Sequence, residues 1–138
     1  MGKEYTEIDE RLQKWISRQK MFFVATAPNA PDGLINCSPK GLDSLCVIGA
    51  NQIAYVDTGG SGIETVAHLK DTGRITLMLC AFDGPPKIVR FYGPGTVLEP
   101  HDADFDEILA RFPPMPAARN IIVINVERII DSCGYGVP

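Results

Sequence analysis

Two short segments of this sequence carry residue types that could hold a phosphate group. The run Gly59-Gly60-Ser61-Gly62 leads into an expected helix, where glycines allow a sharp turn and the first helical N–H groups can receive an anion. Lys40, in the run Ser38-Pro39-Lys40-Gly41, follows a strand of small and apolar residues and could pair with the same phosphate. Two plainer interpretations remain open: a flexible loop for the glycines, and a solvated surface charge for the lysine.

Two other motifs are better explained as structural features. Asp57-Thr58-Gly59 resembles the catalytic triplet of small dimeric aspartic proteases, but the apolar-apolar-Gly element that those enzymes need later in the chain occurs earlier, at Val47-Ile48-Gly49. We therefore interpret Asp57 as part of a strand end that turns through Asx and Gly residues. The carboxylates within Asp102–Asp106 lack the accompanying Gly and Glu of a calcium loop, and the chain has only two histidines, so we expect no metal site.

The elements that must position these residues are mostly strands. Apolar residues at helical spacing predict a helix within residues 4–20, capped by Thr6 and Asp9, and two more helices are expected at Ile63–Asp71 and Asp104–Arg111. The expected strands are 21–26, Leu34–Ser38, Leu45–Ala50, Ile53–Val56, Arg74–Phe82, Ile88–Leu98 and Asn120–Ile130. Six or seven antiparallel strands with a few helices predict a mainly β fold, a small barrel. We expect a single domain over residues 1–138, with an N-terminal helix in 1–20 and the barrel in 21–138.

The composition limits the classes of function. The 138 residues include 13 Lys and Arg against 17 Asp and Glu, a formal net charge of −4. No basic stripe is available to follow a nucleic-acid backbone, so we expect no nucleic-acid partner. No apolar run approaches the length of a membrane span, and the first residues lack the apolar core of a signal peptide. The four cysteines form no Cys-x-x-Cys pair and lie mostly in apolar runs, so we expect buried, reduced thiols in a cytoplasmic protein.

The order of several segments resembles a known family. These segments are Leu34–Gly41, Ile53–Gly62, Glu64–Leu69, Arg74–Phe82, Ile88–Gly93 and Cys133–Pro138. In this order they look like the FMN-binding split-barrel family, which includes the pyridoxamine 5'-phosphate oxidases. The more similar branch is the one that carries Ser-Pro-Lys-Gly and Gly-Ser-Gly. The resemblance implies an FMN-binding split barrel that forms a homodimer, with FMN in a groove between the subunits.

The resemblance also implies which residues contact the cofactor. Lys40 matches a basic residue that contacts the FMN phosphate in the oxidases, and Ser61 and Gly62 match the phosphate loop. The other matched residues lie along the flavin or on a neighbouring strand: Asn36, Cys37, Ser38, Tyr55 and Val56. Arg90 is a further candidate for cofactor contact, although a charge among strand residues could equally point outward to solvent. No residue is assigned a catalytic role.

Four positions depart from the oxidase pattern. The oxidases carry an arginine at the position of Ile35, an Arg-Lys pair at Ser61-Gly62 and a glutamine at Ile88, and their C-terminal substrate segment would lie beyond Pro138. Two hypotheses remain. The first is an FMN-dependent oxidoreductase that acts on a small molecule. The second is a non-enzymatic binding module on the same barrel, for haem, a deazaflavin or another ligand, in which a histidine or cysteine would ligate a haem iron.

Overall fold

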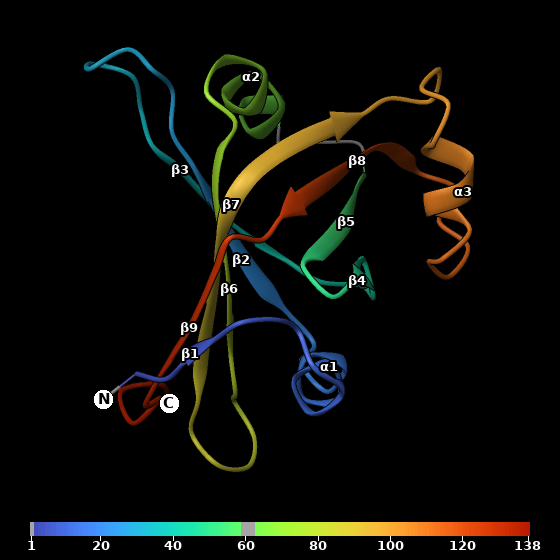
Figure 1. Ribbon diagram of the computed structural model, residues 1–138. Coiled ribbons are helices and arrows are strands. Elements are labelled where there is room, and N and C mark those ends of the chain that lie inside the picture. Colours follow the sequence, from blue (N-terminus) through green and yellow to red (C-terminus); the bar gives the residue numbers. More distant parts are fainter. Residues whose placement is uncertain (1, 59–62) are drawn as a thin grey trace.

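A computed structural model describes residues 2–58 and 63–138, and Figure 1 shows the path of the chain. In this part of the chain, three helices accompany nine strands. The helices are α1 (Glu10–Ser17), α2 (Ile63–Asp71) and α3 (Phe105–Leu109). The strands are β1 (Glu4–Tyr5), β2 (Phe22–Thr26), β3 (Asn36–Lys40), β4 (Leu45–Gly49), β5 (Gln52–Thr58), β6 (Arg74–Cys80), β7 (Ile88–Leu98), β8 (Ala118–Asn125) and β9 (Arg128–Ser132). The mainly β fold class expected from the sequence is confirmed.

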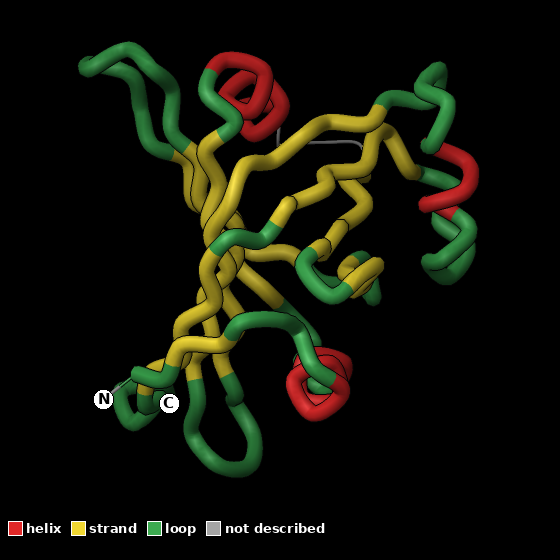
Figure 2. The backbone as a smooth tube through the Cα atoms, viewed as in Figure 1, coloured by secondary structure: helices red, strands yellow, loops and turns green. Residues whose placement is uncertain are grey.

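The strands form one antiparallel sheet that opens into two lobes. Their order is β3-β2-β6-β7-β8-β5-β4, and β9 pairs with both β7 and β1. The first part of β7 pairs with β6 and β9, whereas its last residues pair with β8. Figure 2 shows the strands of the two lobes diverging from this shared strand. The arrangement is a split barrel, in which β7 belongs to both halves.

A glycine allows the chain to cross itself where the two lobes meet. A side chain at Gly93 would overlap the backbone carbonyl oxygen of Asn125, at the end of β8. Immediately afterwards, the Glu127 N–H donates a hydrogen bond of 2.8 Å to the carbonyl oxygen of Tyr92. The connection from β8 to β9 therefore passes directly over β7, and only a residue without a Cβ fits beneath it.

Two apolar clusters hold the elements together. The larger one fills the barrel and includes Tyr55, Phe91 and Leu12, each at most 2% exposed. Helix α1 closes one end of the barrel, where its apolar face is buried and its N-cap, Asp9, accepts a 2.8 Å hydrogen bond from the Leu12 N–H. The second cluster lies beneath α3, where Phe105 packs on the other side of β5 and β8.

The N-terminal segment differs from the expectation. The helix begins at Glu10 with Asp9 as its cap, so the capping role expected for Thr6 was wrong. The residues before it, Glu4–Tyr5, form β1 and pair with Ile129–Ile130 of β9. A pairing partner more than a hundred residues away overrides the local helical pattern, which carries no information about that partner.

The expected strand over Asn120–Ile130 is in fact two strands, which accounts, together with β1, for a larger number of strands than expected. The break falls at Val126 and Glu127, whose N–H groups bond to the carbonyl oxygens of Asn51 and Tyr92 rather than to a sheet neighbour in register. The strand expected at Leu34–Ser38 lies two residues later, at Asn36–Lys40. The expected helix Ile63–Asp71 and strand Ile88–Leu98 are confirmed with the same bounds.

The cysteines are free thiols, but only part of the expected burial is correct. Cys80 is buried, whereas Cys37 and Cys133 are exposed and Cys46 is half-buried. Cys37 is exposed because it lies on the outward-facing side of β3, opposite the core. Among the described residues, no helix has the length and apolar character needed to cross a membrane.

Candidate functional site

Three predicted site residues lie on one side of β3. Asn36, Ser38 and Lys40 occupy alternate positions of the strand, and Lys40 pairs in register with Phe22, a core residue that is 2% exposed. Asn36 Nδ2 donates hydrogen bonds to Ser38 Oγ at 3.2 Å and to Thr65 Oγ1 at 3.0 Å. The alternation of the strand therefore brings an amide, a hydroxyl and an ammonium group to its inner side, where β3 faces α2.

The Lys40 ammonium group lies beside a buried carboxylate. Its Nζ is 3.6 Å from Asp57 Oδ1, and Arg119 Nη2 donates a 2.7 Å hydrogen bond to Asp57 Oδ2. The carboxylate side chain is 4% exposed, against 17% for Lys40 and 32% for Arg119. Two cations thus share one anion, and the group carries one net positive charge in a place with limited access to water.

Sequence reasoning did not identify Arg119. The register between β5 and β8 shifts between Asp57 and Thr58, which pair with Asn120 and Ala118, so Arg119 is the extra residue of a β-bulge. Bulges commonly redirect a side chain at the edge of a site, and here the guanidinium turns toward Asp57. No local signal in the sequence marks this bulge, because it depends on a strand partner sixty residues away.

The first turn of α2 completes this group of residues. Thr65, which is 2% exposed, accepts the hydrogen bond from Asn36 and so fixes the start of α2 beside β3. One turn later, a 2.9 Å hydrogen bond joins His68 Nδ1 to Thr26 Oγ1. The predicted phosphate-loop residues Ser61 and Gly62 lie outside the described residues. We call the assembled group the inner cluster: Asn36, Ser38, Lys40, Asp57, Thr65 and Arg119.

The side chains of the two predicted contacts on β5 are buried in the single chain. The Tyr55 side chain is fully buried and packs edge-on against Phe22, with ring centroids 5.5 Å apart. Val56 is 2% exposed and points to the opposite side of β5, where it lines a small cavity of about 230 Å³ together with Lys40. Within one chain the core residues of the barrel surround the Tyr55 side chain, and contact of this part of β5 with a cofactor stays a prediction.

Two buried polar atoms near the inner cluster have no hydrogen-bond partner among the described residues. They are Tyr55 Oη and Asn120 Oδ1. Burial, and then the nearby Asp57 charge, raise the pKa of Tyr55 well above its ordinary value, so the phenol stays neutral. Asn120 pairs in register with Asp57. Buried polar atoms without partners are costly, and their presence beside charged groups is typical of a site that receives a polar ligand or water.

The remaining predicted contacts, Cys37 and Arg90, lie on the outer side of the sheet. Cys37 pairs with Ala25 of β2, and Arg90 lies three strands from β3, on β7, about 14 Å away at the usual strand spacing. Arg90 Nη1 donates a 3.3 Å hydrogen bond to Ser132 Oγ of β9. Neither residue joins the inner cluster within one chain, and the outward-facing interpretation of Arg90 is the one that the geometry favours.

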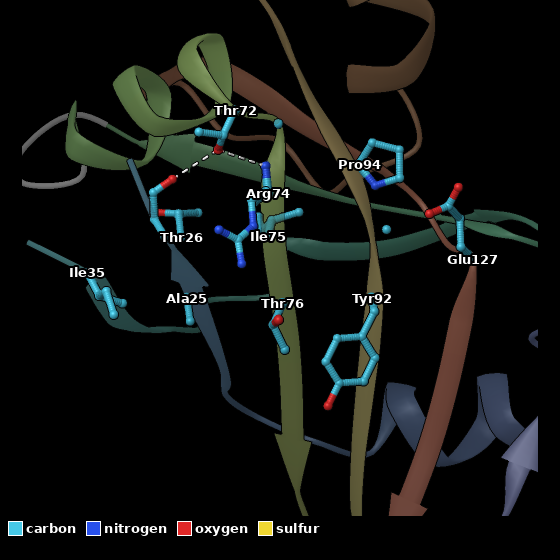
Figure 3. A pocket seen from close by; sticks show the side chains of 13 residues that line it. Ala25, Thr26, Ile35, Thr72, Arg74, Ile75, Thr76, Tyr92, Pro94 and Glu127 are labelled. Atoms are coloured by element: carbon cyan, nitrogen blue, oxygen red, sulfur yellow. Dashed lines mark hydrogen bonds between the residues drawn. The ribbon is translucent and has the colours of Figure 1, made fainter. Parts of the chain in front are cut away.

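The outer side also carries an open cavity of about 730 Å³, shown in Figure 3. Thr76 and Tyr92 form its floor on β6 and β7, and Ile35 approaches from the loop that precedes β3. Thr72 Oγ1 closes its upper end by bonding to the Arg74 N–H and to the carbonyl of Ala27. The cavity is a shallow face with mixed polar and apolar groups, suited to a planar molecule or to a second protein surface.

Exposed apolar side chains surround β3. Leu34 and Ile35, before the strand, are 85% and 76% exposed, and Leu42, after it, is 87% exposed. Ile63, at the start of α2, is 59% exposed. Figure 1 shows the connection from β2 to β3 extending away from the body of the chain. Large apolar side chains gathered at one edge are typical of an interaction surface.

Comparisons with known proteins show the family of this chain and the similarity of its fold to solved structures. The family model described as pyridoxamine 5'-phosphate oxidase matches residues 8–133. The curated pyridoxamine 5'-phosphate oxidase family protein ustO of Aspergillus flavus is 39% identical over 97% of this chain, but the chain spans only 55% of that relative. A variant of HupZ from Group A Streptococcus has a TM-score of 0.70 at 22% identity, over 91% of this chain and 99% of that one. An FMN-binding protein from Syntrophomonas wolfei has a TM-score of 0.59 at 22% identity, over 80% of this chain and 75% of that one.

Proposed function

The chain belongs to the pyridoxamine 5'-phosphate oxidase family, and from this premise we propose that it is an FMN-binding flavoprotein that acts as an oxidoreductase on a small molecule. One observation carries the proposal: the inner cluster joins two cations and several neutral donors beside the first turn of a helix. The similarity in fold to the FMN-binding protein of Syntrophomonas wolfei supports the choice of cofactor.

The inner cluster fits the phosphate end of such a cofactor. Lys40 and Arg119 together exceed the charge of Asp57 by one unit, so an incoming phosphate meets a net positive site. Ser38 Oγ and Asn36 Nδ2, 3.2 Å apart, supply neutral hydrogen-bonding groups beside the charges. The N–H groups of the first turn of α2, held near Asn36 by Thr65, favour an anion at the same place.

Asp57 has two opposite effects on this site. By bonding Arg119 and attracting Lys40 it holds both cations in place before the ligand arrives, which reduces the ordering cost of binding. It also competes with the phosphate for Lys40, because a carboxylate 3.6 Å from the ammonium group neutralises part of its charge. The same pairing argues against a protease, since a carboxylate bound to two cations is not free to share a proton with a second carboxylate.

We propose that the site is completed in a homodimer. Leu34, Ile35 and Leu42 flank the strand that carries the inner cluster, and a second copy that covers them would turn the open edge into a groove. The outer-face cavity in Figure 3 would then lie at or near the interface. Sedimentation velocity should show a dimer for the parent chain and a monomer for the double variant Leu34→Asp/Leu42→Asp. A parent that sediments as a monomer would refute this part of the proposal.

Bound FMN would supply the electron-transfer chemistry, and the chain's own residues would bind and orient it. Lys40 and Arg119 would hold the phosphate, and Asn36 and Ser38 would lie along the ribityl chain. No side chain of the inner cluster is placed as a general acid or base, so positioning of the reactants is the protein's main contribution.

A second candidate function is a non-enzymatic binding module. It is favoured by one observation: Asp57 lies within salt-bridge distance of both cations, and the aliphatic Ile35 provides no further positive charge. A ligand without a phosphate would then be preferred. For haem, His68 is already bonded to Thr26 through Nδ1, and the side chain of His101 is 77% exposed among carboxylates. The Nδ1 bond does not prevent His68 from ligating an iron through Nε2, whereas the exposed His101 provides no buried axial position.

Flavin titration separates the two functions. The purified chain is titrated with FMN, riboflavin and haem, and each mixture is dialysed before its spectrum is recorded. The proposal predicts that FMN is retained, that riboflavin binds at least about tenfold more weakly because it lacks the phosphate, and that haem is lost. Retention of haem or riboflavin in preference to FMN would support the binding module instead.

Activity is tested on the FMN-loaded protein. The bound flavin is reduced anaerobically and mixed with quinone and nicotinamide acceptors, with free FMN as the reference. An oxidoreductase should re-oxidise faster than free FMN with at least one acceptor, because the protein orients both reactants. Rates equal to those of free FMN across the panel would leave flavin binding intact but contradict the enzymatic part of the proposal.

A further inference from the structure

A second cavity lies between α1 and the loop that joins β6 to β7, at the lower end of the view in Figure 1. Its volume is about 730 Å³, within the range of small-molecule sites. None of its lining residues belongs to the inner cluster or to the outer-face cavity. The lining residues are Arg11, Trp15, Arg18, Gln19, Lys20, Met21, Phe82, Asp83, Gly84, Pro85, Pro86 and Lys87.

The charge of this cavity is opposite to that of the chain. Four cations, Arg11, Arg18, Lys20 and Lys87, line it together with a single carboxylate, Asp83. The chain as a whole carries −4. Within the described residues, none of the four cations forms a salt bridge, whereas Lys14, Lys40, Lys70, Arg119 and Arg128 all do. The positive charge of these four side chains is therefore not neutralised by a salt bridge within the described residues.

Lys87 is held in place by aromatic groups. Its Nζ donates a 3.1 Å hydrogen bond to Tyr5 Oη and lies 5.3 Å from the centroid of the Trp15 ring and 5.5 Å from that of Tyr5. Tyr5 in turn donates a 2.8 Å hydrogen bond to Asp131. Burial, followed by this hydrogen bond, raises the pKa of Tyr5 to about 12, so the phenol stays neutral and does not cancel the charge of Lys87.

The remaining walls are apolar and partly aromatic. Trp15, which is 8% exposed, forms the wall of the cavity on α1. Phe82, which is 48% exposed, lines the cavity from the β6–β7 loop together with Pro85 and Pro86. The loop turns at Gly84, whose φ of 76° is readily adopted only by glycine. Flat apolar walls with cations at their rim suit a ring that carries a negative group, because the ring gains burial while the anion meets fixed positive charge.

From this juxtaposition we propose that the cavity between α1 and the β6–β7 loop is a second ligand site, which binds a small planar aromatic anion. The ring packs against Trp15, and Lys87 and Arg18 bind its carboxylate or phosphate. The site does not depend on flavin binding, since it shares no residue with the inner cluster. The ligand would be a substrate or an effector that carries an aromatic ring and a negative charge.

The test uses naphthoate and naphthyl phosphate as probes, with naphthamide as the uncharged comparison. Affinity is measured by isothermal titration calorimetry, and the site of binding by the NMR signal of the Trp15 indole N–H, since the chain has a single tryptophan. Both anions should shift that signal, and naphthamide should bind at least about tenfold more weakly. Comparison of the two anions decides between carboxylate and phosphate ligands.

Two variants and a matched control locate the charge. Lys87→Met removes the ammonium group but keeps the aliphatic part of the side chain, and Arg18→Gln removes the charge of an exposed residue. Each should weaken binding of the preferred anion about tenfold. Lys14 lies on α1 outside the cavity, and its side chain is 71% exposed. The control variant Lys14→Met should therefore leave the affinity for the anion unchanged. An unshifted indole signal, equal binding of naphthamide, or equal losses in all three variants would overturn the proposal.

Discussion

Replacement of Lys40 by methionine tests the assigned phosphate site most sharply. The Lys40 ammonium group is 3.6 Å from Asp57 and its side chain is 17% exposed, so a phosphate contact there would be only partly screened by water. A charge-assisted hydrogen bond of this kind is worth about 1.5–3 kcal/mol, and competition from Asp57 places the loss near 2 kcal/mol. We therefore expect Lys40→Met to raise the Kd for FMN roughly thirtyfold.

The comparison with riboflavin isolates the phosphate. Because riboflavin has no phosphate, Lys40→Met should change its Kd by less than about threefold. Asp57 keeps its 2.7 Å bond to Arg119, so the variant should remain folded. Lys70→Met, which also removes a salt-bridged lysine but at an exposed position on α2, is the matched control and should bind both flavins normally. Titration by quenching of flavin fluorescence measures the Kd of each flavin for the parent chain and both variants. An unchanged FMN affinity in Lys40→Met, or equal losses for both flavins, would refute the assignment.

Three further predictions concern stability. Asp57→Asn leaves two cations facing an amide and should lower the unfolding free energy in urea by about 2 kcal/mol, partly restored by phosphate; unchanged stability would contradict the charge arrangement. Gly93→Ala forces a methyl group against the backbone of Asn125 and should lower the unfolding free energy by about 3 kcal/mol. Gly136→Ala, which has open space around it, should leave the unfolding free energy almost unchanged, and equal effects of the two variants would contradict the close crossing of β7. Burial and Asp131 raise the pKa of Tyr5 from 10.0 to about 12, so the unfolded chain loses this proton at a lower pH than the folded chain. The unfolding free energy should therefore fall between about pH 10 and 12. A Tyr5→Phe variant whose unfolding free energy falls equally over this range would show that Tyr5 is not the cause.

The sequence predicts the parts of the fold that depend on local pattern. Helix α2 has its expected bounds because a glycine-rich run precedes it and Gly73, with a φ of 69°, follows it. Strand β7 does too, because it is a continuous run between turn residues. The pairing of Glu4–Tyr5 with β9 was missed because it depends on residues distant in the chain.

The same distinction applies to the candidate site. Asn36, Ser38 and Lys40 were predicted from the family resemblance, and the alternation of β3 is what places their side chains on one side and Cys37 on the other. Arg119 was missed because it enters the inner cluster through a bulge between β5 and β8, which only the register reveals. Tyr55 was expected at the cofactor because it lies on a matching strand, but its side chain fills the barrel core.

The visible absorption spectrum of the protein after loading with FMN and exhaustive dialysis tests the central claim most directly. The inner cluster, with its two cations beside the first turn of α2, predicts that flavin absorbance remains with the protein at close to one FMN per chain. In a parallel sample loaded with riboflavin, the absorbance should be lost, because the phosphate contacts are missing. A colourless protein after FMN loading would contradict the assignment of this chain as a flavoprotein.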